Sequence, residues 1–286
     1  MSAMKNYIAL TKPRITWLIL MSTAIGFYFG AAAGWTWLTF LHTLVGTGLI
    51  ASGTAALNQW YEAEADAKMK RTEGRPLPAG LISAAKALWF AIGLSILGFL
   101  ELGLGNNWLT AGLGLFTLAS YLFVYTPLKQ RTPHSTTVGA IPGAMPPLIG
   151  YAAAHGSLTW DAWALYAILF VWQFPHFYAI AWMYREDYGN AGIRMLPVVD
   201  RDGTSTAWHI AVTSLLLIPV SLAPVFLSMT GKVYLAGAVA MGLFYLYRSA
   251  QTLRSLTFAS ARAVLLASVI YLPVLYVLLL LDHTRL

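Results

Sequence analysis

Long apolar stretches alternate with short polar segments along most of the chain. A helix of about 20 apolar residues matches the thickness of the bilayer's hydrocarbon core. The pattern therefore predicts an all-α, polytopic membrane protein with nine spans, near residues 15–33, 38–59, 84–103, 108–127, 136–154, 161–182, 207–229, 232–248 and 263–281. Three prolines interrupt the fifth span, and such breaks are tolerated where neighbouring groups satisfy the backbone, often beside a cavity.

The composition agrees with a membrane-embedded bundle. Hydrophobic residues make up 58% of the chain, and mean hydropathy is +0.64. We expect residues 1–286 to form one transmembrane domain surrounded by the lipid bilayer. The absence of cysteine from the sequence excludes disulfides, thiolate metal sites and a cysteine nucleophile.

The basic residues predict the orientation. With the N-terminus in the cytoplasm, all but two of the 18 lysines and arginines fall in cytoplasmic segments, the exceptions being Lys232 and Arg285. This bias follows the positive-inside rule and places the C-terminus outside. We expect the protein to lie in a bacterial plasma (inner) membrane. Nothing in the sequence resembles a nucleic-acid module, so the net charge of +7 reflects topology.

The acidic residues gather in two cytoplasmic segments. One group follows the second span and the other follows the sixth, comprising Glu62, Glu64, Asp66 and Glu73, then Glu186, Asp187, Asp200 and Asp202. Topology alone does not require this division, because acidic residues contribute little to it. Two clusters four spans apart predict a site between two four-helix halves, spans 1–4 and 5–8, with the ninth span appended.

The first acidic segment has the spacing of a ligand set. Asn58, Glu62 and Asp66 are four residues apart, so on a helix their oxygens line one face. Oxygen ligands suit Mg²⁺, which usually binds through one or two carboxylates plus substrate phosphates, and Arg71 and Arg75 would complement a phosphate. The alternative is a solvated segment in which Glu62 and Asp66 form ordinary i,i+4 pairs with neighbours such as Lys70.

Together the clusters and the basic residues suit a Mg²⁺-bound diphosphate whose apolar tail enters the bundle. Mg²⁺ would neutralise charge on a departing diphosphate. Aromatic faces can stabilise the allylic cation left behind, and several lie near the cytoplasmic ends of spans, among them Trp60, Tyr61, Tyr121, Tyr125, Trp172, Phe174, Phe177 and Tyr178. The alternative for these aromatics is a membrane-interface belt.

Five motifs resemble the UbiA-type intramembrane prenyltransferases. They are Lys12-Pro-Arg-Ile15, the Asn58-x-x-x-Glu62-x-x-x-Asp66 motif continuing to Arg75-Pro-Leu77, Tyr125-Thr-Pro-Leu-Lys129-x-Arg131 leading to Gly139–Pro147, Trp172-Gln-Phe-Pro-His-Phe177, and Glu186-Asp-Tyr188 continuing to Met195-Leu-Pro-Val198. The resemblance runs from about residue 8 to residue 275, and the Gln-x-Pro-His-Phe and Met-Leu-Pro-Val elements are typical of the haem-farnesylating branch.

The resemblance implies a farnesyltransferase that uses farnesyl diphosphate and Mg²⁺, with haem b as substrate rather than cofactor. The farnesyl cation would be captured by a vinyl group of haem b and quenched by water, giving haem O and diphosphate for terminal oxidases. Haem O also serves as the precursor of haem A, so a haem A synthase is an expected partner.

The matched positions imply residue roles at a site facing the cytoplasm. Metal and catalytic roles fall on Asn58, Glu62 and Asp66, and further catalytic roles on Arg71 and His176. Substrate-binding roles fall on Arg75, Tyr125, Lys129, Arg131, Gln173, Arg185, Glu186 and Asp187. Many relatives have aspartate at position 62, and the second motif here is not a pair of aspartates four apart.

Several alternatives stay open on the sequence. His176 could ligate haem iron, contact diphosphate or be structural, and Arg185 could simply pair with Glu186 or Asp187. The same fold could prenylate a quinone-ring or chlorophyll-type acceptor. A transporter would place charges near the bilayer midplane, whereas these spans are almost free of charge. A non-catalytic haem-binding module would not need the acidic clusters.

Overall fold

The computed structural model describes residues 3–31 and 35–284, which are almost entirely helical. Within these residues the only strand-like pairing is an isolated bridge between Thr230 and His283. The helices are α1 (Ala3–Leu10), α2 (Pro13–Gly30), α3 (Trp37–Tyr61), α4 (Ala63–Asp66), α5 (Ala84–Gly105), α6 (Trp108–Ala119), η1 (Ser120–Tyr125), α7 (Thr126–Leu128), α8 (Ser135–Gly143), α9 (Met145–His155), α10 (Trp160–Met183), α11 (Arg185–Asn190), α12 (Leu196–Val199), α13 (Thr204–Ser221), α14 (Ala223–Phe226), α15 (Lys232–Arg254) and α16 (Phe258–Leu281).

The all-α membrane architecture expected from the hydropathy pattern is confirmed. Helices occupy each of the predicted spans, and among the described residues seven helical segments are long and apolar enough to cross a membrane. The other two positions are α2, which has 18 residues, and the pair α8 and α9, which is interrupted at Ala144. The count of nine crossings and the orientation stay predictions, and the predicted external Arg285 lies outside the described residues.

The interruption in the fifth span follows from its prolines. Pro142 lies inside α8 and cannot donate a backbone hydrogen bond, while Pro146 lies in the first turn of α9, where a missing N–H is tolerated. The side-chain nitrogen of Gln173 on α10 donates to the Ala140 carbonyl at 3.2 Å, so a neighbouring helix supplies a polar partner beside the break. The interruption that the prolines predicted in this span is therefore a break between two helices.

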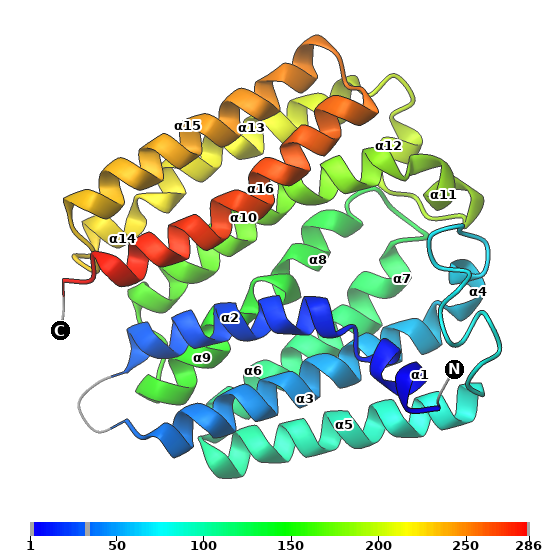
Figure 1. The fold of residues 1–286 in the computed structure, drawn as a ribbon, viewed down its shortest axis with the longest axis horizontal. Helices are drawn as coiled ribbons and strands as arrows, with labels where there is room; N and C mark the ends of the chain where they lie inside the picture. Colours follow the sequence, from blue (N-terminus) through cyan, green and yellow to red (C-terminus); the bar gives the residue numbers. More distant parts are fainter. Residues whose placement is uncertain (1–2, 32–34, 285–286) are drawn as a thin grey trace.

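The helices pack in two groups. One core lies among α10, α13, α15 and α16, whereas α2 packs along α9 and α3 along α5 in the other group (Figure 1). Glycine permits the closest approach, since a Cβ added at Gly150 on α9 would collide with the Thr23 carbonyl of α2. The packing thus differs from the expected division into spans 1–4 and 5–8 with an appended ninth span. The C-terminal part of the fifth span, α9, packs against α2, and α16, the last helix, lies within the core formed with α10, α13 and α15.

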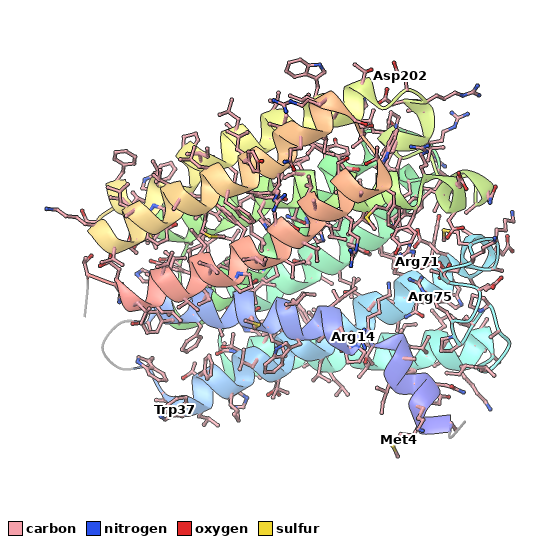
Figure 2. The ribbon with its side chains drawn as sticks, turned by 45° about the horizontal axis from the view of Figure 1, so that its top comes forward. Met4, Arg14, Trp37, Arg71, Arg75 and Asp202 are labelled. Atoms are coloured by element: carbon pink, nitrogen blue, oxygen red, sulfur yellow. The ribbon has the colours of Figure 1, made fainter. Side chains whose placement is uncertain are left out.

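Most short helices lie at one end of the bundle. Figure 1 shows α1, α4, α11 and α12 there, with the N-terminus at this end and the C-terminus at the other. Arg14, Arg71 and Arg75 lie toward the same end in Figure 2, whereas Trp37 marks the opposite end. The two segments that carry the acidic clusters therefore meet at one end of the molecule.

Candidate functional site

The Asn58, Glu62 and Asp66 side chains extend from the end of α3 into α4. The helix changes direction at Glu62, which lies between the two elements. Backbone hydrogen bonds from the Glu62 nitrogen to the Asn58 carbonyl, 2.9 Å, and from the Asp66 nitrogen to the Glu62 carbonyl, 2.8 Å, keep the i,i+4 spacing through this point. The predicted helical register of the three residues is confirmed, with a break that the sequence did not indicate.

Each of these three side chains contacts a basic residue, two of them from distant parts of the chain and Arg75 from the same segment. The Lys12 ammonium donates to Asn58 Oδ1 at 3.1 Å, and Arg75 pairs with Asp66 at 2.6 Å. The Lys129 ammonium lies 2.9 and 3.1 Å from the two Glu62 carboxylate oxygens. The Asn58 amide nitrogen in turn donates to Glu62 at 2.8 Å, which links two of the three oxygen-bearing groups directly.

These pairings exclude the alternative of ordinary i,i+4 salt bridges. Glu62 pairs across 67 residues, with Lys129, and Asp66 pairs with Arg75. Among the described residues only one further ion pair is formed, between His42 and Glu101 toward the other end of α3 and α5. Glu62 is therefore neutralised by a distant residue, and Asp66 by a residue beyond helical i,i+4 spacing.

Lys129 is placed by an unusual helical segment. The chain forms a π-helical turn, η1, and a short α7 directly before this residue, and π-turns occur often at functional sites. The ammonium lies 4.6 Å from the ring centre of Tyr125 and 6.0 Å from that of Tyr121. Burial alone would lower the pKa of Lys129, but Tyr125 and Glu62 outweigh it and hold the pKa above its ordinary value. Arg131, expected to help Lys129, is exposed.

Lys12 is a site residue that the sequence analysis did not assign. It has a left-handed backbone, with φ 48°, and turns the chain from α1 into α2, so that its side chain reaches Asn58. Burial, together with the nearby positive charges of Arg75 and Lys129, lowers the pKa of Lys12 to about 7. The Lys-Pro-Arg motif marked this position, but its pairing across 46 residues had no signal in the sequence.

The donor atoms at this site fit Mg²⁺ in kind. Two carboxylates and one amide supply hard oxygen ligands, which is the set that Mg²⁺ uses together with substrate phosphates. Among the described residues no three His, Asp or Glu side chains form a metal-binding group. A metal at this site would therefore need oxygens from a ligand such as a diphosphate.

The second acidic segment lines a pocket of its own. Arg185, Glu186 and Asp187 begin α11 and line a cavity of about 400 Å³, together with the start of α16. The guanidinium of Arg185 stacks on the Trp182 ring at 3.8 Å. No ion pair joins Arg185 to Glu186 or Asp187 within the part of the chain that the structure describes, so the simple loop salt bridge is not formed.

Arg71 connects the two acidic segments. Its guanidinium donates to the Tyr188 hydroxyl at 3.2 Å and lies over the rings of Tyr184 and Tyr188, at 5.2 and 5.6 Å. A small buried cluster continues this contact, with Ala65 and Met69 from the first segment and Ala181, Ala191, Ile193 and Met195 around the second. The expected meeting of the two segments at one end of the bundle is confirmed.

Gln173 and His176 make their hydrogen bonds away from the acidic residues. Gln173 is buried, and its amide nitrogen donates to the carbonyls of Ala140 and Leu169. The Nδ1 atom of His176 lies 2.7 Å from the Ser268 hydroxyl on α16. The structure therefore places both residues on the α10 surfaces that contact α8 and α16.

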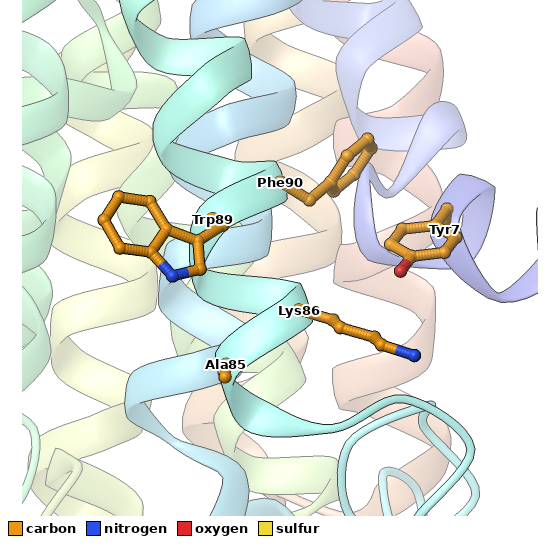
Figure 3. A pocket seen from close by; sticks show the side chains of 5 residues that line it. All are labelled: Tyr7, Ala85, Lys86, Trp89 and Phe90. Atoms are coloured by element: carbon orange, nitrogen blue, oxygen red, sulfur yellow. The ribbon is translucent and has the colours of Figure 1, made fainter.

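A shallow pocket on the outer side of α1 and α5 is unrelated to this site. It has a volume of about 500 Å³ and is lined by Tyr7, Ala85, Lys86, Trp89 and Phe90 (Figure 3). None of the residues predicted to act on a substrate lies in it. Aromatic and lysine side chains of this kind are typical of a membrane–water boundary.

Comparison with known proteins identifies relatives of the whole chain. The model of the UbiA prenyltransferase family matches residues 19–280. A protoheme IX farnesyltransferase from Solibacter usitatus is 62% identical, over 98% of this chain and 99% of the relative.

Two solved structures share the fold. One is described as digeranylgeranylglyceryl phosphate synthase in membranes, with a TM-score of 0.83, 17% identity and complete coverage of both chains. The other is a UbiA homologue from Archaeoglobus fulgidus bound to GPP and Mg²⁺, with a TM-score of 0.70, 18% identity and coverage of 96% of this chain and 99% of that one.

Proposed function

This chain belongs to the UbiA prenyltransferase family, and from that premise we propose that it transfers a farnesyl group from farnesyl diphosphate to a vinyl group of haem b. Water adds to the product cation, giving haem O and diphosphate. The observation that carries this proposal is the 62% identity, over nearly the full length of both chains, to a protoheme IX farnesyltransferase. The enzyme is an integral, multi-pass membrane protein, and we place its active site at the cytoplasmic end of a bacterial inner membrane bundle.

Asn58, Glu62 and Asp66 would hold Mg²⁺ together with the diphosphate. Support comes from their oxygen donors and from the fold neighbour that binds GPP and Mg²⁺. When bound, Mg²⁺ supplies positive charge that stabilises the departing diphosphate.

The basic side chains at these three residues supply the rest of the diphosphate site. Lys12, Lys129 and Arg75 already converge on the acidic motif, so an arriving diphosphate meets preorganised positive charge. Lys12 donates to the neutral Asn58 amide, whereas Lys129 and Arg75 each neutralise a carboxylate. Of these three basic residues, Lys12 alone could therefore turn toward a phosphate without breaking an ion pair with a carboxylate.

The outer charged residues would guide the diphosphate and close the site. Arg71 holds the second segment against the first and keeps exposed N–H groups at this end, and Arg131 adds positive charge nearby. Arg185, Glu186 and Asp187 would form the second side of the site at their own cavity. These assignments rest on the meeting of the two segments.

Aromatic groups would accompany the farnesyl cation and the haem. Tyr125 presents its ring to the Lys129 ammonium, and this contact supports a role for the ring in stabilising positive charge. His176, with Trp172 and Phe177 beside it, would contact haem b. Gln173 would keep α10 packed against α8 through its hydrogen bond to Ala140. Transfer of the product to a haem A synthase stays a prediction.

The decisive test is turnover by purified protein with haem b, farnesyl diphosphate and Mg²⁺, followed by mass detection of the porphyrin. We expect haem O from the wild type, and none after EDTA treatment or in Asp66→Asn. Glu101→Gln, a carboxylate change in the external His42 pair, should leave turnover intact. Prenylation of a different acceptor would refute haem b as substrate, and metal-independent transfer would refute the role of the acidic motif.

A further inference from the structure

His176 lies in a hydrogen-bonded arrangement that fixes where its proton resides. Its Nδ1 atom is 2.7 Å from the Ser268 hydroxyl oxygen, and that oxygen is 2.6 Å from the Leu265 carbonyl oxygen one turn earlier in α16. A carbonyl oxygen can only accept a hydrogen bond, so the Ser268 proton must point at Leu265. Without that proton the two oxygens would repel each other at this distance.

The hydrogen bond between His176 and Ser268 can then have only one donor. Because the Ser268 proton is used at Leu265, the Ser268 oxygen can only accept from His176 Nδ1. A neutral histidine carries one ring proton, so Nδ1 is protonated and Nε2 keeps its lone pair. No hydrogen bond reaches Nε2 from any residue in the described part of the chain.

Trp172 secures the same geometry from a second direction. Its ring stacks on the His176 ring, with centres 4.8 Å apart and planes 23° apart. Its indole N–H donates to the backbone carbonyl of Ser268 at 2.9 Å. The Trp172 side chain therefore contacts both the His176 ring and the Ser268 backbone. Phe177 packs edge-on to the imidazole at 5.3 Å. The imidazole is therefore held with Nε2 free and an aromatic surface around it.

We propose that Ser268 is a positioning residue that keeps the His176 Nε2 lone pair available to the iron of the haem substrate. The inference rests on the proposed function, because it takes haem b as the ligand. A metal-binding histidine typically donates its other N–H to a fixed acceptor, which sets the tautomer and strengthens the ligand. Ser268 provides that acceptor from a separate helix, 92 residues away.

Binding of haem b to the full-length protein in lipid nanodiscs, without farnesyl diphosphate, tests this role. Affinity is measured by titration of the haem absorption band, and the iron–histidine stretching band is measured by resonance Raman spectroscopy of the ferrous complex. Ser268→Ala should weaken haem binding by roughly tenfold or more and shift the iron–histidine band to lower frequency. Ser268→Thr, which keeps the hydroxyl, should restore both.

Two further variants separate positioning from a loss of packing. Ser249→Ala removes a different buried hydroxyl, one that pairs with Ser214 at 2.7 Å on neighbouring helices, and should leave affinity and band unchanged. His176→Ala should remove the iron–histidine band. Where Ser268→Ala does not fold, Ser268→Cys keeps the side-chain volume with a weaker acceptor and should show the same direction of change.

The proposal is overturned if the wild type lacks an iron–histidine band, if His176→Ala retains it, or if Ser268→Ala matches the wild type in both measurements. Turnover of the wild type to haem O, assayed separately, distinguishes this outcome from failure of the proposed function. Haem O production with an unchanged Ser268→Ala spectrum refutes the inference alone. A normal iron–histidine band without any prenyl transfer refutes the proposed function alone.

Discussion

Replacing Lys129 by methionine should destabilise the protein by about 3–5 kcal/mol, because the change leaves a buried carboxylate without its counter-charge. The Lys129 and Glu62 side chains are only 13% and 12% exposed, and the ammonium lies 2.9 and 3.1 Å from the two carboxylate oxygens. Glu62→Gln should have an effect of the same order, since it leaves the ammonium unpaired. The double variant should lose about as much as either single variant, because it leaves no unpaired charge.

The measurement is a double-mutant cycle of unfolding free energy. Denaturation by SDS in mixed micelles can be followed through the fluorescence of the chain's 11 tryptophans. We expect a coupling energy of about 3–5 kcal/mol, equal to one single loss, because the double variant loses no more than either single variant. Glu101→Gln is the matched control, because its pair with His42 is 32% exposed on each side and should contribute no more than about 1 kcal/mol. Strictly additive losses, or single losses as small as the control's, would refute the buried-pair argument.

Three further predictions follow from individual contacts. Lys12→Met should raise the KM for farnesyl diphosphate most at acidic pH, because the Lys12 amine is charged below its pKa of about 7 and increasingly neutral above it. A ratio of variant to wild-type KM that does not change between pH 6 and 9 would contradict this prediction. Gly150→Ala should destabilise the protein by about 1–3 kcal/mol, as the new methyl group meets backbone of α2, whereas Gly93→Ala, which meets nothing, should be neutral or slightly stabilising in the same denaturation assay. Arg71→Ala should raise the KM while changing stability by less than about 1 kcal/mol, since its bond to Tyr188 is exposed; an unchanged KM would remove Arg71 from the site.

Local patterns in the sequence were sufficient for the membrane architecture. The bilayer imposes a fixed length of apolar helix, so each span leaves a signal in consecutive residues, and helices occupy all the predicted positions. The i,i+4 spacing of Asn58, Glu62 and Asp66 is likewise a local property, and it survives the change of direction at Glu62. Prolines in the fifth span also indicated a break that the structure contains.

Which residues would meet across the fold was not encoded in any local pattern. Arg75 and Lys129 were expected to bind substrate, but nothing in the sequence indicated that they pair with Asp66 and Glu62, and the contact of Lys129 with Glu62 spans 67 positions. Lys12 had no assigned role. Ser268 gave no signal at all, because a serine in an apolar helix usually bonds to its own backbone. Its contact with His176 depends on how α10 and α16 pack.

The sequence by itself thus determined the helical membrane class, the end of the bundle that carries charge and the helical spacing of the acidic motif. The tertiary structure alone decided the grouping of the helices, the cation that each acidic side chain holds and the free nitrogen of His176. The physical reason is the sequence distance over which each kind of interaction acts. Hydropathy and helical spacing act over a few turns of one segment, whereas ion pairs and hydrogen bonds between helices depend on side-chain packing that many distant residues set together.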